Sequence, residues 1–460
     1  MPRPHELTAR QMADAFRRRE LSPVEVTRAV LARIEAWEPR INAMYRVSAD
    51  LALDQAKASE ARWRAGQPLS AIDGVPVTIK ENIATRGDPA PIGTRANEDA
   101  PPQPADAPPA ARVREAGGVM LGKTTMPDYG MLSSGLSSLH GITRIPWRLD
   151  RNTSGSSSGA GAAAVARYAP LHIGTDIGGS LRLPATHCGI FAHKPSLGRV
   201  PIVPPFTGRV AGPMTRTVED AALLMNVIAR PDARDHMSLP PLDEDFTMRP
   251  ARRRLRIGFI ADMGVGLPVD ATVRAAAEAA AKALERAGCA VEPVRSFMTA
   301  EMLDGVCRFF EARSQNDLAQ LPRGKRDKVL PFIVEWCTWR AERFSGREVM
   351  QAYLQVMAMR EAAVAATAPY DFILSPTSPV LPYAAELPSP NDDPHDALPH
   401  IAFTVAYNMS EQPAASVNWT SVDGLPVGVQ LVGHRFDDAG VLELARLVEE
   451  LRPAQRPWPD

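Results

Sequence analysis

The stretch DRNTSGSSSGAGAAAVARYAPLHIGTDIGGSLRLPA, residues 150–185, joins two glycine- and serine-rich clusters through an alanine-rich run and a short apolar run. The first cluster alone has the composition of a flexible linker. The alanine-rich run is typical of a helix, and YAPLHIGT (168–175) is typical of a buried strand. Because packed elements follow the first cluster directly, two interpretations are open: a flexible tether, or a tight turn inside a core.

Further apolar runs on both sides of this stretch predict an α/β fold. Strands are expected in IDGVPVTIKEN (72–82) and GGVMLGKT (117–124), and later in RLRIGFI, YDFILSPT and LPVGVQLVG. Residues 6–66 have apolar positions at helical spacing, with Ser22 as an N-cap and Pro23 at the first helical position. Another helix is expected at 273–288. Strands that alternate with helices favour a mainly parallel, buried sheet.

The composition excludes several classes of partner. The chain of 460 residues has 52 basic and 53 acidic residues and a formal net charge of -1, so neither nucleic acid nor an anionic membrane is expected to bind. No run approaches the roughly 20 apolar residues that span a bilayer, and the N-terminus lacks the apolar segment of a signal peptide. The 4 cysteines have no zinc-ligand spacing, so no metal site is expected, and unpaired thiols suit a reducing cytoplasm.

The segment GGVMLGKT (117–124) matches the phosphate-binding pattern G-x-x-x-x-G-K-[ST]. Its variable positions include Val119, Met120 and Leu121, which belong inside a strand rather than in a loop that wraps phosphates. A proline follows where the phosphate-capping helix should begin, at Pro127. The segment is therefore interpreted as a buried strand, with nucleotide binding as the rejected alternative.

The second cluster, GTDIGGS (174–180), has the layout of a turn between a strand and a helix. Such a turn directs backbone N–H groups at one point, which is the arrangement of an oxyanion hole, and it places Ser180 as a nucleophile. A nucleophilic serine needs a base, usually histidine. Lys80, at the end of an apolar strand, is the alternative, because burial lowers the pKa of a lysine. The histidines nearby are His172, His187 and His193.

Seven blocks in this order resemble the amidase signature family. They are DGVPVTIKEN, LGKTTMPDYG, NTSGSSSGAGAAAVA, PLHIGTDIGGSLRLPA, KPSLGRV, GPMTRTVEDAALL and GLPVGVQLVG, collinear from about residue 70 to residue 433. The resemblance implies a large mixed, mainly parallel central sheet covered by helices on both faces. It implies one amidase domain over 1–460, with an N-terminal helical segment (1–66), a catalytic core (70–225), a helical and loop region on the substrate side (226–400) and C-terminal strands with a helix (401–460).

The resemblance also implies a Ser–cisSer–Lys triad. Ser180 is the expected nucleophile of an acyl-enzyme, Lys80 the base, and Ser156 the serine that relays protons, so the first cluster becomes a buried catalytic turn. The spacing of the two serines in the family selects Ser156 over its neighbours. No metal or organic cofactor is required. The expected oxyanion donors are the backbone N–H groups of Ile177, Gly178, Gly179 and Ser180; the supporting residues are Gly155, Ser157, Asp176 and Arg182; the substrate pocket is expected at Gly130, Met131 and Leu132.

Three functions stay open within this resemblance. The first is a stand-alone amidase that acts on a small-molecule amide in the cytoplasm; homodimers are frequent in the family. The second is the glutaminase subunit of a tRNA-dependent amidotransferase, which typically reads DTGGSIRQPA where this chain has the apolar Ile177 and Leu183. The third is a catalytically dead scaffold, although all three triad positions are present.

Four sites depart from the family pattern. Glu81 stands where aspartate commonly follows the lysine, and Thr153–Ser154 replace the usual Pro–Gly or Gly. Leu132 and Glu411 stand at usual glycine positions, and both are expected to reshape the substrate pocket. The apolar pocket residues favour an aliphatic or aryl amide over a charged, malonamate-like one.

Overall fold

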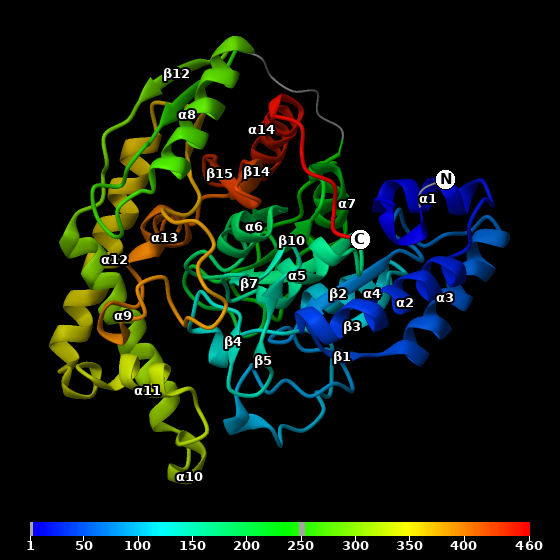
Figure 1. The fold of residues 1–460 in the computed structure, drawn as a ribbon, viewed down its shortest axis with the longest axis horizontal. Helices are drawn as coiled ribbons and strands as arrows, with labels where there is room; N and C mark the ends of the chain where they lie inside the picture. The colour runs from blue at the N-terminus through cyan, green and yellow to red at the C-terminus, as the bar shows by residue number, and fades with distance from the viewer. Residues whose placement is uncertain (1–2, 248–253) are drawn as a thin grey trace.

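The fold is built on one mixed sheet, in a computed structural model that describes residues 3–247 and 254–460 (Figure 1). Within these residues the sheet has 11 strands, in the order β1-β3-β2-β8-β10-β9-β14-β15-β13-β11-β12. Its strands are β1 (Met44–Val47), β2 (Pro76–Lys80), β3 (Val119–Thr124), β8 (Leu171–Asp176), β9 (Phe191–Lys194), β10 (Val210–Thr215), β11 (Arg256–Phe259), β12 (Ala290–Pro293), β13 (Phe372–Pro376), β14 (Ala414–Val422) and β15 (Leu425–Val432). Two small hairpins pair β4 (Leu136–Ser137) with β5 (Gly141–Ile142) and β6 (Arg144–Ile145) with β7 (Arg148–Asn152).

Pairing in the sheet is parallel at two places and antiparallel elsewhere. β2 pairs in parallel with β3 and β8, and β11 pairs in parallel with β12 and β13. The strands between them, β10, β9, β14 and β15, pair antiparallel. Asp423 and Gly424 join β14 to β15 with φ of 51° and 78°, which is the geometry of a tight hairpin turn. The expected mixed α/β sheet is confirmed, and its parallel pairs are confined to these two groups of strands.

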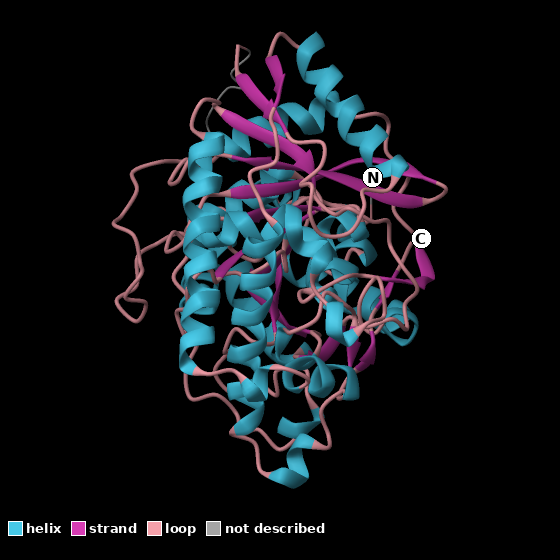
Figure 2. Cartoon of the chain, turned by 90° about the vertical axis from the view of Figure 1, so that its left-hand side faces the viewer, coloured by secondary structure: helices cyan, strands magenta, loops and turns pink. Residues whose placement is uncertain are grey.

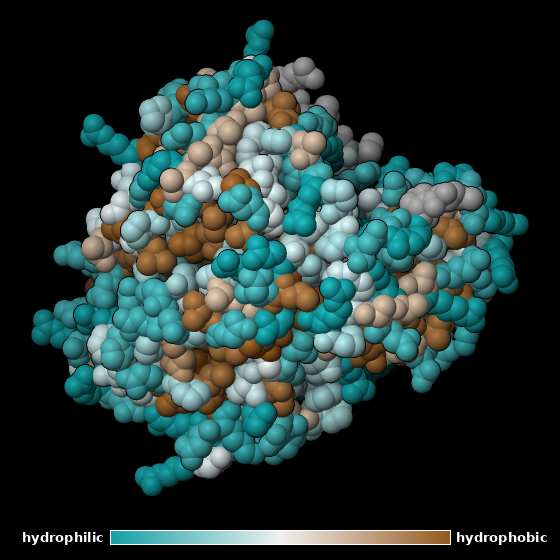
Figure 3. Space-filling model, in the orientation of Figure 1, coloured by the Kyte–Doolittle hydropathy of each residue, from teal (hydrophilic) through white to brown (hydrophobic). Residues whose placement is uncertain are grey.

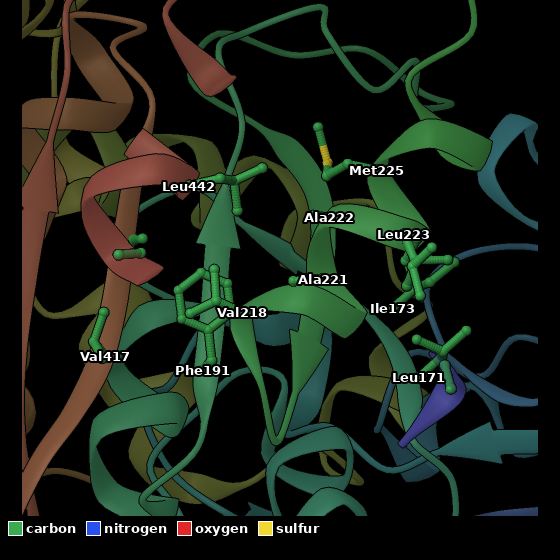
Figure 4. Close-up of a cluster of buried hydrophobic side chains, with 14 of the residues drawn as sticks. Leu171, Ile173, Phe191, Val218, Ala221, Ala222, Leu223, Met225, Val417 and Leu442 are labelled. Atoms are coloured by element: carbon green, nitrogen blue, oxygen red, sulfur yellow. The ribbon is translucent and has the colours of Figure 1, made fainter. Parts of the chain in front are cut away.

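Helices cover both faces of the sheet. In β8, Leu171 and Ile173 lie beside residues of α7 (Figure 4). A Cβ at the next residue, Gly174, would meet Ser157 Oγ, at the start of α5, at 2.7 Å. Because successive residues of a strand point to opposite faces, α7 and α5 lie on opposite sides of the sheet. The helices are α1 (Ala9–Arg17), α2 (Pro23–Ile41), α3 (Ala49–Arg64), α4 (Pro108–Glu115), α5 (Ser158–Ala166), α6 (Arg182–Cys188), α7 (Val218–Ile228), α8 (Ala271–Arg286), α9 (Ala300–Ala319), α10 (Arg323–Arg326), α11 (Pro331–Thr338), α12 (Gly346–Thr367), α13 (Ala402–Met409) and α14 (Asp438–Leu451).

The N-terminal segment is largely helical, as predicted, but it also contributes a strand. Ser22 Oγ accepts a hydrogen bond from Glu25 N, and Pro23 begins α2, which confirms the predicted cap. α2 ends at Ile41 because Asn42 adopts a left-handed conformation, with φ of 52°. The chain then forms β1, the edge strand, antiparallel to β3. The prediction of an entirely helical segment was wrong at this strand.

The two ends of the molecule are both helical. The N-terminal helices lie at one end and α9–α12 at the other (Figure 1), and Figure 2 views the latter side, where long helices cover much of the molecule. Hydrophobic residues occur in patches among hydrophilic ones on the face drawn in Figure 3. Large exposed apolar side chains include Met350 and Leu354 of α12. The expected homodimer stays a prediction.

Candidate active site

Lys80 ends a strand in the middle of the parallel group, and its amine is fully buried. Its Nζ lies 2.8 Å from Ser156 Oγ, 3.0 Å from Ser157 Oγ and 3.0 Å from Thr175 Oγ1. Burial lowers the pKa of Lys80 well below its ordinary value, and the nearby positive charge of Arg209 lowers it further. A neutral amine in contact with hydroxyl groups can accept a proton from one of them.

Ser156 lies in a buried turn between β7 and α5, and the tether interpretation is wrong. Every residue from Asn152 to Ala166 is buried, and the Gly155–Ser156 peptide bond is cis. A Cβ at Gly155 would come within 2.6 Å of Ser134 O and 2.7 Å of Ser134 N, so only glycine fits there. This close packing fixes the serine hydroxyl beside the lysine amine.

Ser180 lies in the turn between β8 and α6, and Asp176 holds that turn. The Oδ1 atom of Asp176 accepts a hydrogen bond from Gly179 N at 2.7 Å, and Oδ2 accepts one from Leu181 N at 3.0 Å. Ser157 N donates to Ser180 O at 3.2 Å, so the two turns are joined. The predicted strand-to-helix turn is confirmed.

The backbone amides of the 177–180 turn differ in their partners. The Gly179 N–H donates to Asp176, whereas no hydrogen bond from the amides of Ile177, Gly178 or Ser180 is found within the described residues. These three N–H groups can therefore donate to a substrate oxygen, while the one at Gly179 holds the turn. The predicted set of oxyanion donors fits this geometry best without Gly179.

Asp176 and Arg182 form a buried ion pair beneath this turn, with both side chains at 0% exposure. The Arg182 guanidinium also donates to Thr404 O, Gln430 Oε1 and Asn408 Oδ1. Burial alone would raise the pKa of Asp176, but the Arg182 charge and the hydrogen bonds it accepts lower that pKa to about 2. Sequence reasoning found this pair but missed its partners from α13 and β15.

The Ser156 and Ser180 side chains line one cavity that has two chambers. The chamber on the Ser156 side also contains Asn82, Thr175 and Arg209, and has an empty volume of about 920 Å³, including the part open to solvent. The second chamber contains Ser180 but not Ser156, and has an empty volume of about 560 Å³. Both volumes are in the range of small-molecule sites. Among the described residues, no hydrogen bond joins the two serine hydroxyls.

The second chamber is mainly apolar. Gly130, Met131 and Leu132 line it, as the sequence predicted for the substrate pocket, and Ile177 adds one wall. Sequence reasoning missed the rest of its lining, which comes from distant helices and loops. The missed residues include Phe310, Trp336, Leu398 and Ile401, with the charged Arg313 and Asp317.

The three histidines considered as bases belong to the core. His172 Nδ1 lies 2.7 Å from Thr78 Oγ1, and burial lowers its pKa to about 3. His193 Nε2 lies 3.2 Å from Asp438 Oδ1, and His187 Nε2 lies 3.5 Å from Ser378 Oγ. None of the described histidines lines either chamber.

The phosphate-binding match at 117–124 is a buried strand, as predicted. β3 covers Val119–Thr124, every residue of which is buried, and Lys123 Nζ donates to Ile83 O. Within the described part of the chain, no group of three or more histidine, cysteine or acidic side chains is arranged to hold a metal ion. No described helix is long and apolar enough to cross a bilayer.

Of the family departures, Leu132 lines the apolar chamber and Glu411 does not. Glu411 instead forms ion pairs with Arg360, at 2.7 Å, and Arg435. Its expected effect on the pocket was therefore wrong, because these arginines hold it outside the cavity. Glu81 is fully buried and accepts a hydrogen bond from Gly93 N at 2.9 Å, which is a structural contact.

A family model described as Amidase matches residues 25–442. The chain belongs to the amidase signature family. It is an amidase, a hydrolase that acts on amide bonds, as the sequence predicted. Its curated relatives include two proteins named as the A-type subunit of glutamyl-tRNA(Gln) amidotransferase: that of Symbiobacterium thermophilum is 35% identical, with 95% of each chain covered, and that of Moorella thermoacetica is 33% identical, with 99% of this chain and 98% of the relative covered.

Solved structures of amidases have the same fold. A bacterial aryl acylamidase superposes with a TM-score of 0.90 at 28% identity, with 97% of this chain and 96% of that chain covered. A 6-aminohexanoate cyclic dimer hydrolase, solved with its substrate, superposes with a TM-score of 0.85 at 27% identity, with 98% of each chain covered. The mixed sheet with its helical layers is thus the fold of this family.

Proposed function

We propose that this amidase hydrolyses a small carboxylic amide with Ser180 as nucleophile, Ser156 as proton relay and Lys80 as base. The observation that carries the proposal is the fully buried Lys80 amine, 2.8 Å from the Ser156 hydroxyl in a cavity that also contains Ser180. Lysine can act as a base at neutral pH when burial holds it unprotonated. The reaction needs no metal or organic cofactor.

The proposed acylation step moves two protons towards Lys80. As Ser180 Oγ bonds to the amide carbon, its proton passes to Ser156 Oγ, and the Ser156 proton passes to Lys80 Nζ. The carbonyl π electrons move to the oxygen, which accepts hydrogen bonds from the amides of Ile177, Gly178 and Ser180. The C–N bond then breaks, and the leaving nitrogen takes a proton from Ser156, which Lys80 replaces. Contacts between such groups often tighten only when substrate is bound.

Deacylation uses the same groups with water in place of the amine. Water gives one proton to the Ser156–Lys80 relay and bonds to the acyl carbon. The bond between the acyl carbon and Ser180 Oγ breaks, and the proton returns to that oxygen. The balanced products are a carboxylic acid and an amine, or ammonia when the amide is primary.

The apolar chamber favours a stand-alone amidase that acts on an aliphatic or aryl acyl group. Phe310, Trp336 and Ile401 provide apolar surface next to Ser180, and burial of an apolar acyl group there is favourable. The fold likeness to a bacterial aryl acylamidase supports this reading. The location in the cytoplasm stays a prediction.

The second candidate is the glutaminase subunit of a tRNA-dependent amidotransferase. The curated relatives favour it over the stand-alone reading, since they carry that subunit's name and match nearly the whole of both chains. If the chain is that subunit, it should release ammonia from glutamine, and addition of the partner subunits should increase the rate. If it is a stand-alone amidase, it should release benzoate from benzamides without partners and leave glutamine intact. Ammonia release and chromatography distinguish the two.

Covalent labelling tests the proposed nucleophile. We expect one fluorophosphonate adduct per chain in intact-mass spectrometry, mapped to Ser180, and none in Ser180→Ala. Ser158→Ala is the matched control, because Ser158 is another buried serine of the turn beside the cavity, and it should label as the unmodified protein does. Labelling that persists in Ser180→Ala would contradict the proposal. No adduct with this probe or with a smaller sulfonyl fluoride would favour the dead scaffold.

A further inference from the structure

Two arginines reach the cavity from separate segments without an acidic partner. Arg209, just before β10, is half-buried, and its Nη1 donates to Pro204 O at 3.0 Å. Arg313 of α9 is also half-buried, and its guanidinium carbon lies 4.4 Å from the centre of the Phe206 ring. Within the described chain no ion pair shorter than 4.0 Å is formed by either arginine. Their guanidinium groups are therefore open to an anion.

The charges that line the chamber on the Ser156 side do not balance. Burial lowers the pKa of Arg209 to about 10, so this side chain stays positive at neutral pH. Asp176 lines the same chamber, but its charge is matched by Arg182. That leaves Asp317 alone to oppose the two arginines. A cavity with an excess positive charge attracts an anionic group, and a guanidinium group suits a carboxylate.

The position of Arg209 indicates which part of the substrate carries the anion. Arg209 lines only the chamber that contains Ser156, whereas Arg313 lies where the two chambers meet. In the proposed mechanism the leaving nitrogen takes its proton from Ser156, so the amine part of the substrate must lie in that chamber. The apolar chamber, which has no Arg209, is left for the acyl part.

We propose that the amine part of the substrate carries a carboxylate, held by Arg209 with Arg313, while an apolar acyl group fills the other chamber. The substrate class is then an N-acylated amino acid, with the carboxylate on the leaving amine. This inference rests on the proposed function and adds a binding residue to it. Hydrolysis of the C–N bond by water gives an apolar carboxylic acid and a free amino acid, so atoms and charge balance.

A matched substrate series tests the proposal. The probes are N-benzoyl derivatives of ω-amino acids with one to five methylene groups, each compared with its neutral primary amide, and benzoate release is measured by chromatography. We expect kcat/KM to be at least about 10-fold higher for the best carboxylate than for its neutral partner, because a charge-assisted bidentate contact is lost in the amide. Arg209→Gln should remove this preference mainly through KM, and Arg209→Lys should restore part of it.

Arg308→Gln is the matched control variant. Arg308 lies on the same helix as Arg313 but pairs with Asp304 outside the cavity, so both substrates should be hydrolysed as by the unmodified enzyme. Equal hydrolysis of the charged and neutral probes, with Arg209→Gln lowering both alike, would overturn the inference and leave the proposed function standing. Arg209-dependent hydrolysis of glutamine instead would overturn it by placing the carboxylate on the acyl side. Loss of both hydrolysis and Ser180 labelling would overturn the proposed function itself.

Discussion

Replacement of Lys80 by methionine should lower kcat by about 10⁴-fold or more, in line with the loss of a catalytic base. Methionine keeps an apolar stem in the buried site but cannot accept or return a proton. The amine it removes contacts the hydroxyls of Ser156, Ser157 and Thr175. The measurement is kcat of the purified variant on a benzamide substrate, with circular dichroism to verify that the fold is kept.

Lys123→Met separates lost chemistry from lost packing. Lys123 lies on the neighbouring strand β3, opposite Ile79, and is almost fully buried. Burial also lowers its pKa, to about 7, but its Nζ contacts Ile83 O and not the serines. We expect Lys123→Met to keep kcat within a few-fold. Equal losses in both variants would show that any disturbed buried lysine inactivates the protein, and full activity in Lys80→Met would exclude the proton relay.

The pH profile gives a second readout of the same group. The proposed reaction needs Lys80 unprotonated, so kcat/KM should fall as the pH falls through the pKa of the folded enzyme. Because burial lowers that pKa well below its ordinary value, activity should already be present at neutral pH. The residual activity of Lys80→Met should not follow this limb of the profile.

The strands that sequence reasoning found are those with continuous apolar runs. β2, β3 and β8 are buried along their whole length, and their residues show it. β1 was missed because its four residues include the exposed Arg46 and it is held only at the edge of the sheet. β9 was missed because it buries His193 and Lys194, whose surroundings come from the distant residue Asp438 and from neighbouring strands. Such partners leave no pattern in the local sequence.

The same difference separates the two halves of the site. Ser156, Ser180 and Lys80 stand in short segments whose local geometry the residues themselves impose, so the sequence was enough to place them together. Arg209 and Arg313 reach the cavity through a loop and one face of a helix, and helical spacing does not tell which face covers a cavity. The prediction of an uncharged substrate followed from the apolar residues near Ser180 and missed these arginines.

Replacement of Asp176 by asparagine should destabilise the protein by about 3–5 kcal/mol, the usual cost of leaving a buried charge without its partner. Arg182 would keep its contacts to Thr404 O, Gln430 and Asn408 but lose its only carboxylate. Asparagine also loses the acceptor for one of the amides that fix the Ser180 turn. The measurement is the denaturant midpoint of unfolding at neutral pH.

Two further variants show whether the buried charge is the cause. Asp150→Asn removes an exposed ion pair with Arg148, and no change in the midpoint is expected there. A double change of Asp176→Asn with Arg182→Gln removes both charges and should recover part of the stability. Because the pKa of Asp176 is held at about 2, the stabilisation is complete above about pH 4 and is lost as the pH falls towards 2. If Asp176→Asn changes the midpoint no more than Asp150→Asn does, the neutral partners of Arg182 compensate its charge, and the ion pair does not hold the Ser180 turn.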